Sequence, residues 1–115
     1  MGVIVQKSYA FALSTVKLCH EIMRERKEYI LTKQLIRSAT SIGANVEEAT
    51  GAQTRKDFIA KMYIAYKEAR EAHYWFRLLN DLNLLTADQA QYHLAVAEEV
   101  KKILMSICKS SKENQ

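Results

Sequence analysis

The chain has 115 residues and a mass of 13.2 kDa, which is room for a single domain. Hydrophobic residues make up 49% and charged residues 26%, which excludes a disordered chain and allows a core without disulfides. The formal net charge of +4 permits an anionic partner such as nucleic acid without requiring one. With no proline and only three glycines, the chain lacks the turn residues of all-β and βαβ folds, so an all-α fold is predicted.

The cysteine content and the N-terminal segment bear on the compartment. Cys19 and Cys108 lie far apart in the sequence and form neither a zinc-type pair nor a disulfide framework. We expect both to be small core residues in a reducing compartment. Residues 1–17 lack the basic start and apolar block of a signal peptide, and no apolar run approaches the length of a membrane span. A cytoplasmic protein without membrane contact is therefore expected.

Helical periodicity begins near the N-terminus and predicts a first helix over about residues 3–26. Two adjacent apolar rows follow this segment. One row runs from Val5 to Met23 in steps of three and four, and the other begins at Ile4 and Phe11. Together the two rows predict a helix with a broad buried face.

A second helix is predicted over about residues 32–50, with Thr32 as its N-cap. Gly51 follows directly and is the expected residue for a left-handed C-cap. The middle of this helix is rich in small residues around Gly43. Because glycine inside a helix costs up to about 1 kcal/mol relative to alanine, we expect a close helix contact there that offsets the cost.

A third helix is predicted over about residues 54–80, opening with Thr54 as a cap. A fourth is predicted over about residues 86–109, opening with a capping box of Thr86 and Gln89. The polar residues after it, from Ser110 to the C-terminus, are expected to fray.

Four helices of this length with short loops predict an up-down-up-down four-helix bundle. The first, third and fourth helices each carry two adjacent apolar rows, which is more apolar surface than one bundle buries. The excess indicates either a very well-filled core or a homo-oligomer, and we favour the homo-oligomer. The four rings of residues 73–76 surround the helix and cannot all face one core. Some must meet solvent, a neighbouring subunit or a ligand, and we favour a subunit interface.

Catalytic and metal-binding patterns are missing from the sequence. A di-iron bundle needs Glu-x-x-His pairs, and none of His20, His73 and His93 has a glutamate three residues before it. The chain has no Gly-x-Ser-x-Gly, Walker or dinucleotide-binding motif. Glu47 and Glu48 are adjacent and point about 100° apart on a helix, so they cannot act as a paired acid and base. We expect a protein that is not an enzyme and needs no cofactor.

Basic residues concentrate in the third predicted helix. Four residues share one face because they follow a 3-4-3 step: Lys67, Arg70, Tyr74 and Arg77. Cations around an aromatic ring could follow a phosphate backbone and stack a base. The alternative is a solvated face with i,i+4 pairs, such as Lys67 with Glu71. The nucleic-acid-binding candidates are Arg55, Lys56, Lys61, Lys67, Arg70, Tyr74 and Arg77, and a smaller patch contains Lys101, Lys102 and Lys109.

The most distinctive local pattern is the run of small and polar residues from Arg37 to Gly51, followed by residues 54–58. Amphipathicity alone does not explain Asn45 and Glu48. This pattern resembles the four-helix bundle protein family first noted as reading frames inside intervening sequences of bacterial 23S ribosomal RNA genes. The residues at matching positions are Arg37, Ser38, Ala39, Ser41, Ile42, Asn45, Glu48, Gly51, Lys56, Phe58 and Glu71. The chain departs from the family pattern at Gly43, Ala49, Ala52 and the Lys67-Glu68 pair.

The resemblance covers most of the chain and implies a four-helix bundle that assembles into a ring, a homopentamer. It also implies an RNA-linked genetic context, and related accessory proteins of diversity-generating retroelements engage a reverse transcriptase and nucleic acid. Two functions follow as hypotheses. The protein binds RNA or DNA through its basic residues, or it is an interaction module for a polypeptide such as a reverse transcriptase, without nucleic-acid contact.

The motif also has a physical interpretation beside the resemblance. Asn45 and Glu48 lie one helical turn apart, whereas Arg37 and Glu48 lie three turns apart, too far for a direct pair. A half-buried Glu48 would need a cation, for which we expect Arg70 or a base from a neighbouring subunit. Such a pair would fix helix or subunit register; the alternative is a ligand or RNA contact. The structural candidates are Arg37, Asn45, Glu48, Gly51 and Glu71.

Overall fold

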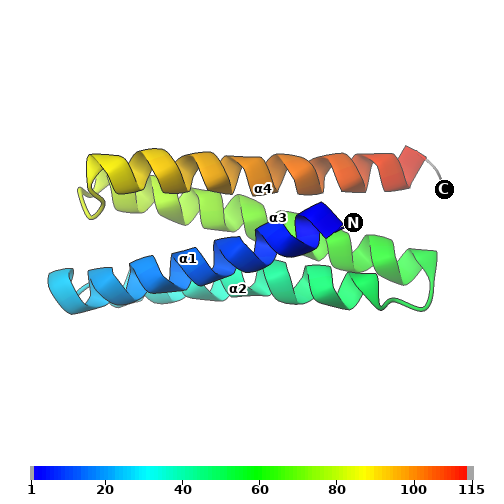
Figure 1. Ribbon diagram of the computed structural model, residues 1–115, viewed down its shortest axis with the longest axis horizontal. Coiled ribbons are helices and arrows are strands. Elements are labelled where there is room, and N and C mark those ends of the chain that lie inside the picture. Colours follow the sequence, from blue (N-terminus) through cyan, green and yellow to red (C-terminus); the bar gives the residue numbers. More distant parts are fainter. Residues whose placement is uncertain (1, 114–115) are drawn as a thin grey trace.

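The computed structural model describes residues 2–113 and contains four α-helices in series (Figure 1). They are α1 (Gly2–Arg26), α2 (Ile30–Thr50), α3 (Arg55–Asp81) and α4 (Ala87–Glu113). Successive helices run antiparallel and pack on one another, and α1 closes the bundle against α4 through fewer contacts. The molecule is a rod of 46 × 20 × 20 Å. The predicted all-α four-helix architecture is confirmed.

The start of α2 differs from the prediction because a side chain outside the helix caps it. The Glu28 carboxylate accepts hydrogen bonds from the backbone N–H of Leu31 at 2.8 Å and of Thr32 at 3.0 Å. Burial alone would raise the pKa of Glu28, but these hydrogen bonds hold it below its ordinary value. The assignment of Thr32 as N-cap is therefore wrong: Thr32 is buried in the first turn, and its hydroxyl donates to the Glu28 carbonyl at 2.8 Å.

The end of α2 also differs from the prediction. Gly51 has φ −101°, so the left-handed C-cap is wrong. Its N–H donates to the Glu48 carbonyl at 3.2 Å, and the N–H of Ala52 donates to Ala49 at 3.1 Å. This tightened last turn satisfies the terminal carbonyls without a positive φ.

The helix starts at Thr54 and Thr86 are confirmed. The Thr54 hydroxyl accepts from the Asp57 N–H at 3.1 Å. At α4 the capping box is reciprocal: the Thr86 N–H donates to the Gln89 side-chain Oε1 at 2.9 Å, and the Gln89 N–H donates to the Thr86 hydroxyl at 3.1 Å. Both starts depend on residues three apart, which the sequence alone reveals.

The end of α4 is longer than predicted. The helix continues to Glu113, so the expected fraying from Ser110 is wrong for residues 110–113, and residues 114–115 lie outside the described part of the chain. Ser111 is buried, and its carbonyl accepts a hydrogen bond from Arg55 Nη2 at 3.4 Å. Contact with the start of α3 therefore supports this last turn.

Aromatic rings from three helices form the centre of the core. The Phe11 and Phe76 rings meet edge to face with centroids 6.0 Å apart, and the His93 ring stacks on Phe76 at 5.5 Å. Apolar side chains extend the core toward both ends of the rod. They include Ile4, Leu18, Ile22, Leu35, Ile42, Val46, Met62, Leu79, Val100 and Leu104.

Only one of the two apolar rows of α1 is buried, so the predicted broad buried face is wrong. The row that begins at Ile4 and Phe11 faces the core. In the row from Val5 to Met23, Cys19 alone is buried, and Tyr9 is 66% exposed. Because α1 packs against α2 and only lightly against α4, the second row stays on the surface of the chain.

Gly43 lies where α1 approaches α2 closely. A β-carbon at this position would lie 3.6 Å from the Ser8 carbonyl oxygen, an ordinary van der Waals contact. Since alanine favours a helix over glycine, we expect Gly43→Ala to raise the free energy of unfolding by about 0.5–1 kcal/mol. Urea denaturation measures the change, and Ala44→Gly on the exposed neighbouring position is expected to lower stability by a similar amount. A loss of stability in Gly43→Ala would contradict this packing.

His93 makes the stability of the core depend on pH. Its side chain is buried, its Nδ1 has no hydrogen-bond partner in the described part of the chain, and burial lowers its pKa below the ordinary 6.5. Below about pH 6.5 the unfolded chain binds a proton at His93 that the folded chain does not bind. The contribution of a neutral His93 to the free energy of unfolding is therefore fully present above about pH 6.5 and is lost as the pH falls below it. We expect the urea midpoint to fall from about pH 7.5 to about pH 5.5, and to fall less in His93→Leu. Equal falls in the two proteins would contradict a buried neutral His93.

Candidate nucleic-acid interface

A hollow with a basic lining lies on the surface where α3 meets α4. Its volume is about 570 Å³. We call it the cationic hollow, and it is lined by Lys67, Arg70, Glu71, His73, Tyr74, Arg77 and Lys101. The structure thus brings together the four residues that helical spacing placed on one face, and it adds Lys101, which the sequence assigned to a separate patch.

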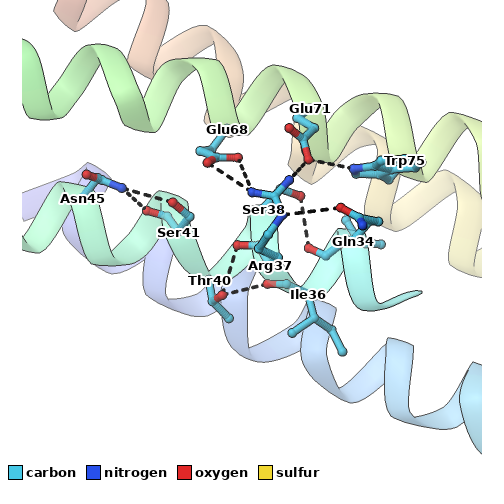
Figure 2. Close-up of polar contacts among 11 residues, drawn as sticks. Gln34, Ile36, Arg37, Ser38, Thr40, Ser41, Asn45, Glu68, Glu71 and Trp75 are labelled. Atoms are coloured by element: carbon cyan, nitrogen blue, oxygen red, sulfur yellow. Dashed lines mark hydrogen bonds and ion pairs between the residues drawn. The ribbon is translucent and has the colours of Figure 1, made fainter. Parts of the chain in front are cut away.

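Three cations of the hollow keep their positive charge free. Among the side chains that the structure describes, no ion pair involves Lys67, Arg70 or Arg77. The alternative pair of Lys67 with Glu71 is not formed. Glu71 instead accepts from Arg37 Nη2 and, at 3.0 Å, from Trp75 Nε1 (Figure 2). The one carboxylate lining the hollow is therefore compensated from α2.

Aromatic rings hold these cations along α3. Each free cation lies about 6 Å from a tyrosine ring centroid, at a distance typical of cation–π contacts. The pairs are Lys67 Nζ over Tyr63 at 5.8 Å, Arg70 Cζ over Tyr66 at 6.0 Å and Arg77 Cζ over Tyr74 at 5.8 Å. Tyr74 is 47% exposed, so its ring is accessible to a ligand in the hollow.

The α4 side of the hollow is built around Glu98. Its Oε2 lies 2.9 Å from Lys101 Nζ and 3.2 Å from His73 Nε2. The hydrogen bond from Lys101 lowers the pKa of Glu98, which keeps that carboxylate charged. Burial, then the charge of Lys101, lowers the pKa of His73 below its ordinary value. At neutral pH His73 is therefore uncharged, and Lys101 is compensated by Glu98.

The other predicted basic residues lie elsewhere on α3. Lys61 Nζ pairs with Glu48 Oε1 at 2.8 Å, Arg55 contacts the end of α4, and Lys56 is exposed. The structure does not bring these three into the cationic hollow. The expected pairing of Glu48 with Arg70 is wrong, because Glu48 pairs with Lys61 instead. Glu48 is also exposed rather than half-buried.

The motif residues of α2 serve its contact with α3. Arg37 reaches across to Glu68 at 3.3 Å and to Glu71 (Figure 2). Glu48 makes the second crossing pair, three turns further along α2. Asn45 acts within its own helix, where Nδ2 donates to the Ser41 carbonyl at 2.8 Å and to its hydroxyl at 3.1 Å (Figure 2). Arg37 and Glu48 thus join α2 to α3 at two separate points.

A metal site and a membrane span each place requirements on the described residues. No group of three or more His, Cys, Asp or Glu side chains in this range is placed to hold a metal ion. None of the described helices combines the length and apolarity needed to cross a membrane. Both cysteines are buried free thiols, and burial raises the pKa of Cys19 to about 12, so this thiol is unreactive at neutral pH.

Family comparison agrees with the fold and the motif. The model of the 23S rRNA-intervening sequence protein family matches residues 3–106. The chain belongs to this family. It is also similar to a crystal structure from Bacteroides thetaiotaomicron VPI-5482, a protein of unknown function from the S23 ribosomal protein family, with 43% identity and a TM-score of 0.89. That match covers 92% of this chain and 98% of the other. No curated protein matches the chain.

Proposed function

We propose that this member of the 23S rRNA-intervening sequence family is a non-enzymatic, homo-oligomeric cytoplasmic protein that binds RNA at the cationic hollow. One observation carries the proposal: Lys67, Arg70 and Arg77 lie on one face of α3, and none of the described side chains forms an ion pair with them. Such cations are suited to phosphates, which supply most of the affinity in nucleic-acid complexes. The family name supports RNA through its link to ribosomal RNA genes.

Each side chain of the hollow has a role in this proposal. Arg70 and Arg77 present planar guanidinium groups that can hold a phosphate through two hydrogen bonds, and Lys67 adds a point charge. Tyr74 offers a ring for base stacking. Lys56 extends the basic surface beyond the hollow, whereas a phosphate at Lys61 would first have to displace Glu48.

The proposed assembly uses the exposed apolar row of α1. A hollow of about 380 Å³ lies on the surface between this row and α2. A second hollow of about 230 Å³, lined by residues of α1, adjoins the first. We call the two together the apolar groove, lined by Ser8, Tyr9, Ala12, Leu13, Val16, Thr40, Gly43, Ala44 and Glu47. In our proposal a second copy of the chain covers this groove, and repetition closes the ring-shaped homopentamer that the family resemblance implies.

Size-exclusion chromatography with light scattering tests both parts. At low salt we expect a mass near five times 13.2 kDa and a shift with RNA that is lost at high salt. Leu13→Asp in the groove is expected to give monomers, whereas Ile30→Asp, at an exposed position at the start of α2, leaves the assembly intact. A wild-type monomer would contradict the assembly, and an assembled protein that ignores RNA would contradict the RNA site.

The apolar groove also supports a second candidate function. Its small residues, Gly43 and Ala44, would let a helix of another polypeptide, such as a reverse transcriptase, pack closely without nucleic-acid contact. A pull-down from nuclease-treated extract distinguishes the two. Equal recovery of a polypeptide by the wild type and by a variant in which Lys67, Arg70 and Arg77 are replaced favours the second candidate. Loss of the polypeptide on nuclease treatment favours RNA binding.

A further inference from the structure

Resting on the proposed function, we propose that this surface selects single-stranded over double-stranded RNA, because α3 presents two tyrosine rings, Tyr63 and Tyr74, on which unpaired bases stack. The stripe that carries them continues the hollow toward the start of α3. It follows 4-3-4-3 steps through Tyr63, Lys67, Arg70, Tyr74 and Arg77. Two rings and three free cations therefore share one face, with two of the cations between the rings.

The two rings occupy similar surroundings. Tyr63 is flanked by Lys67 Nζ at 5.8 Å from α3 and by Lys112 Nζ at 5.7 Å from α4. Tyr74 is flanked by Arg77 from α3 and shares the hollow with Lys101 from α4. Each ring thus forms a small subsite with a free cation of α3 and a lysine of α4, of which Lys101 is paired with Glu98. The subsite at Tyr63 lies outside the cationic hollow.

Both rings are accessible and supported from one side. Tyr63 and Tyr74 are each 47% exposed. The Tyr63 ring lies 6.3 Å from Tyr66, and the Tyr74 ring lies 5.0 Å from Trp75, both centroid to centroid. Tyr66 and Trp75 are themselves partly buried against the core. The two platforms are therefore held in place before a ligand arrives, which lowers the ordering cost of binding.

The spacing of the platforms fits an extended strand. Tyr74 lies eleven positions after Tyr63, which is about 16 Å along a helix. Lys67 and Arg70 lie between them, and Arg70 is held over the partly buried Tyr66 ring. A strand that stacks one base at each end would place its intervening phosphates over these two free cations.

A duplex cannot use this arrangement in full. Its bases are stacked on one another, so it offers phosphates to the cations but no base face to the tyrosines. Stacking on a protein ring is worth about 1–3 kcal/mol per base. We therefore expect the tyrosines to contribute to single-strand affinity and not to duplex affinity, whereas the cations contribute to both.

Fluorescence anisotropy with two probes tests the inference: a uridine homopolymer of about 12 nucleotides, and an RNA duplex of about 12 base pairs, at the same ionic strength. In the Tyr63→Leu/Tyr74→Leu double variant we expect single-strand affinity to fall at least about tenfold and duplex affinity to change less than about twofold. Tyr63→Phe/Tyr74→Phe keeps both rings and is expected to retain the single-strand affinity. Tyr29→Leu/Tyr92→Leu removes two exposed tyrosines from other faces and is the matched control.

The outcomes separate the inference from the proposed function. Equal falls for both probes, or no fall for either, would overturn single-strand selection while RNA binding at the hollow stands. Failure of the wild-type protein to bind either probe at low salt would overturn the proposed function and the inference with it. If the leucine variants have the same circular dichroism spectrum as the wild type, misfolding is excluded as the cause of a loss of RNA affinity.

Discussion

Replacing Lys67, Arg70 and Arg77 together by glutamate is expected to lower the affinity for single-stranded RNA at least about a hundredfold at low salt. The variant loses three phosphate contacts and places three like charges against the strand. Since each contact with a single strand contributes about −0.7 to the logarithmic salt slope, the slope should flatten by about two units. Anisotropy titrations over a range of salt concentrations measure both quantities.

A control for net charge is available at the α1–α2 turn, whose residues do not line the cationic hollow. Arg24, Lys27 and Lys33 are exposed around the α1–α2 turn, and replacing all three by glutamate changes the net charge by the same amount. We expect this control to change RNA affinity by less than about threefold, because its cations lie outside the cationic hollow. Equal losses in the two variants would contradict a localised site and point to nonspecific attraction.

Phe76→Ala is expected to lower the free energy of unfolding by about 3–5 kcal/mol, a large part of the stability of a domain this size. Phe76 is fully buried and contacts both Phe11 and the stacked His93 ring, so its removal opens a cavity where three helices meet. Urea denaturation followed by the fluorescence of Trp75, the one tryptophan, measures the loss at fixed protein concentration.

A leucine at this position distinguishes the loss of buried volume from the loss of the aromatic ring. Phe76→Leu keeps most of the buried volume and is expected to cost less than about 1.5 kcal/mol. A loss below about 1 kcal/mol in Phe76→Ala would contradict the central place of this ring in the core.

The helix starts show which parts of the fold follow from local sequence. Thr54 and Thr86 could be assigned because each cap depends on a residue three positions away. Thr32 could not, because the Glu28 carboxylate reaches the same N–H groups from outside the helix. On α1 two apolar rows were visible, and periodicity gave no means of telling that only one meets a neighbouring helix. That choice depends on how α2 and α4 pack around α1.

The candidate site was predictable along one helix but not across helices. Spacing placed Lys67, Arg70, Tyr74 and Arg77 on one face, which the lining of the hollow reproduces. The free charge of these residues was not predictable, because it depends on Arg37 crossing from α2 to hold Glu71. Lys101 joined the hollow for the same reason, since the packing of α4 on α3 sets its position.

Tyr63 was missed although its signal is present in the sequence. It lies four residues before Lys67 and so continues the 3-4-3 stripe by one step. The prediction rested on the basic residues of this row, and it did not include the tyrosine ring at its start. Lys112, which flanks that ring from α4, is 49 positions later in the chain and had no local signal.

The salt dependence of RNA binding by the wild-type protein tests the central claim most directly. A labelled single-stranded RNA of about 12 nucleotides is titrated at about 50 mM and about 200 mM salt. The free cations of the hollow predict clear binding at the lower concentration and a loss of affinity of more than about tenfold at the higher one. No binding at the lower concentration, or binding that salt leaves unchanged, would contradict the assignment of the cationic hollow as an RNA site.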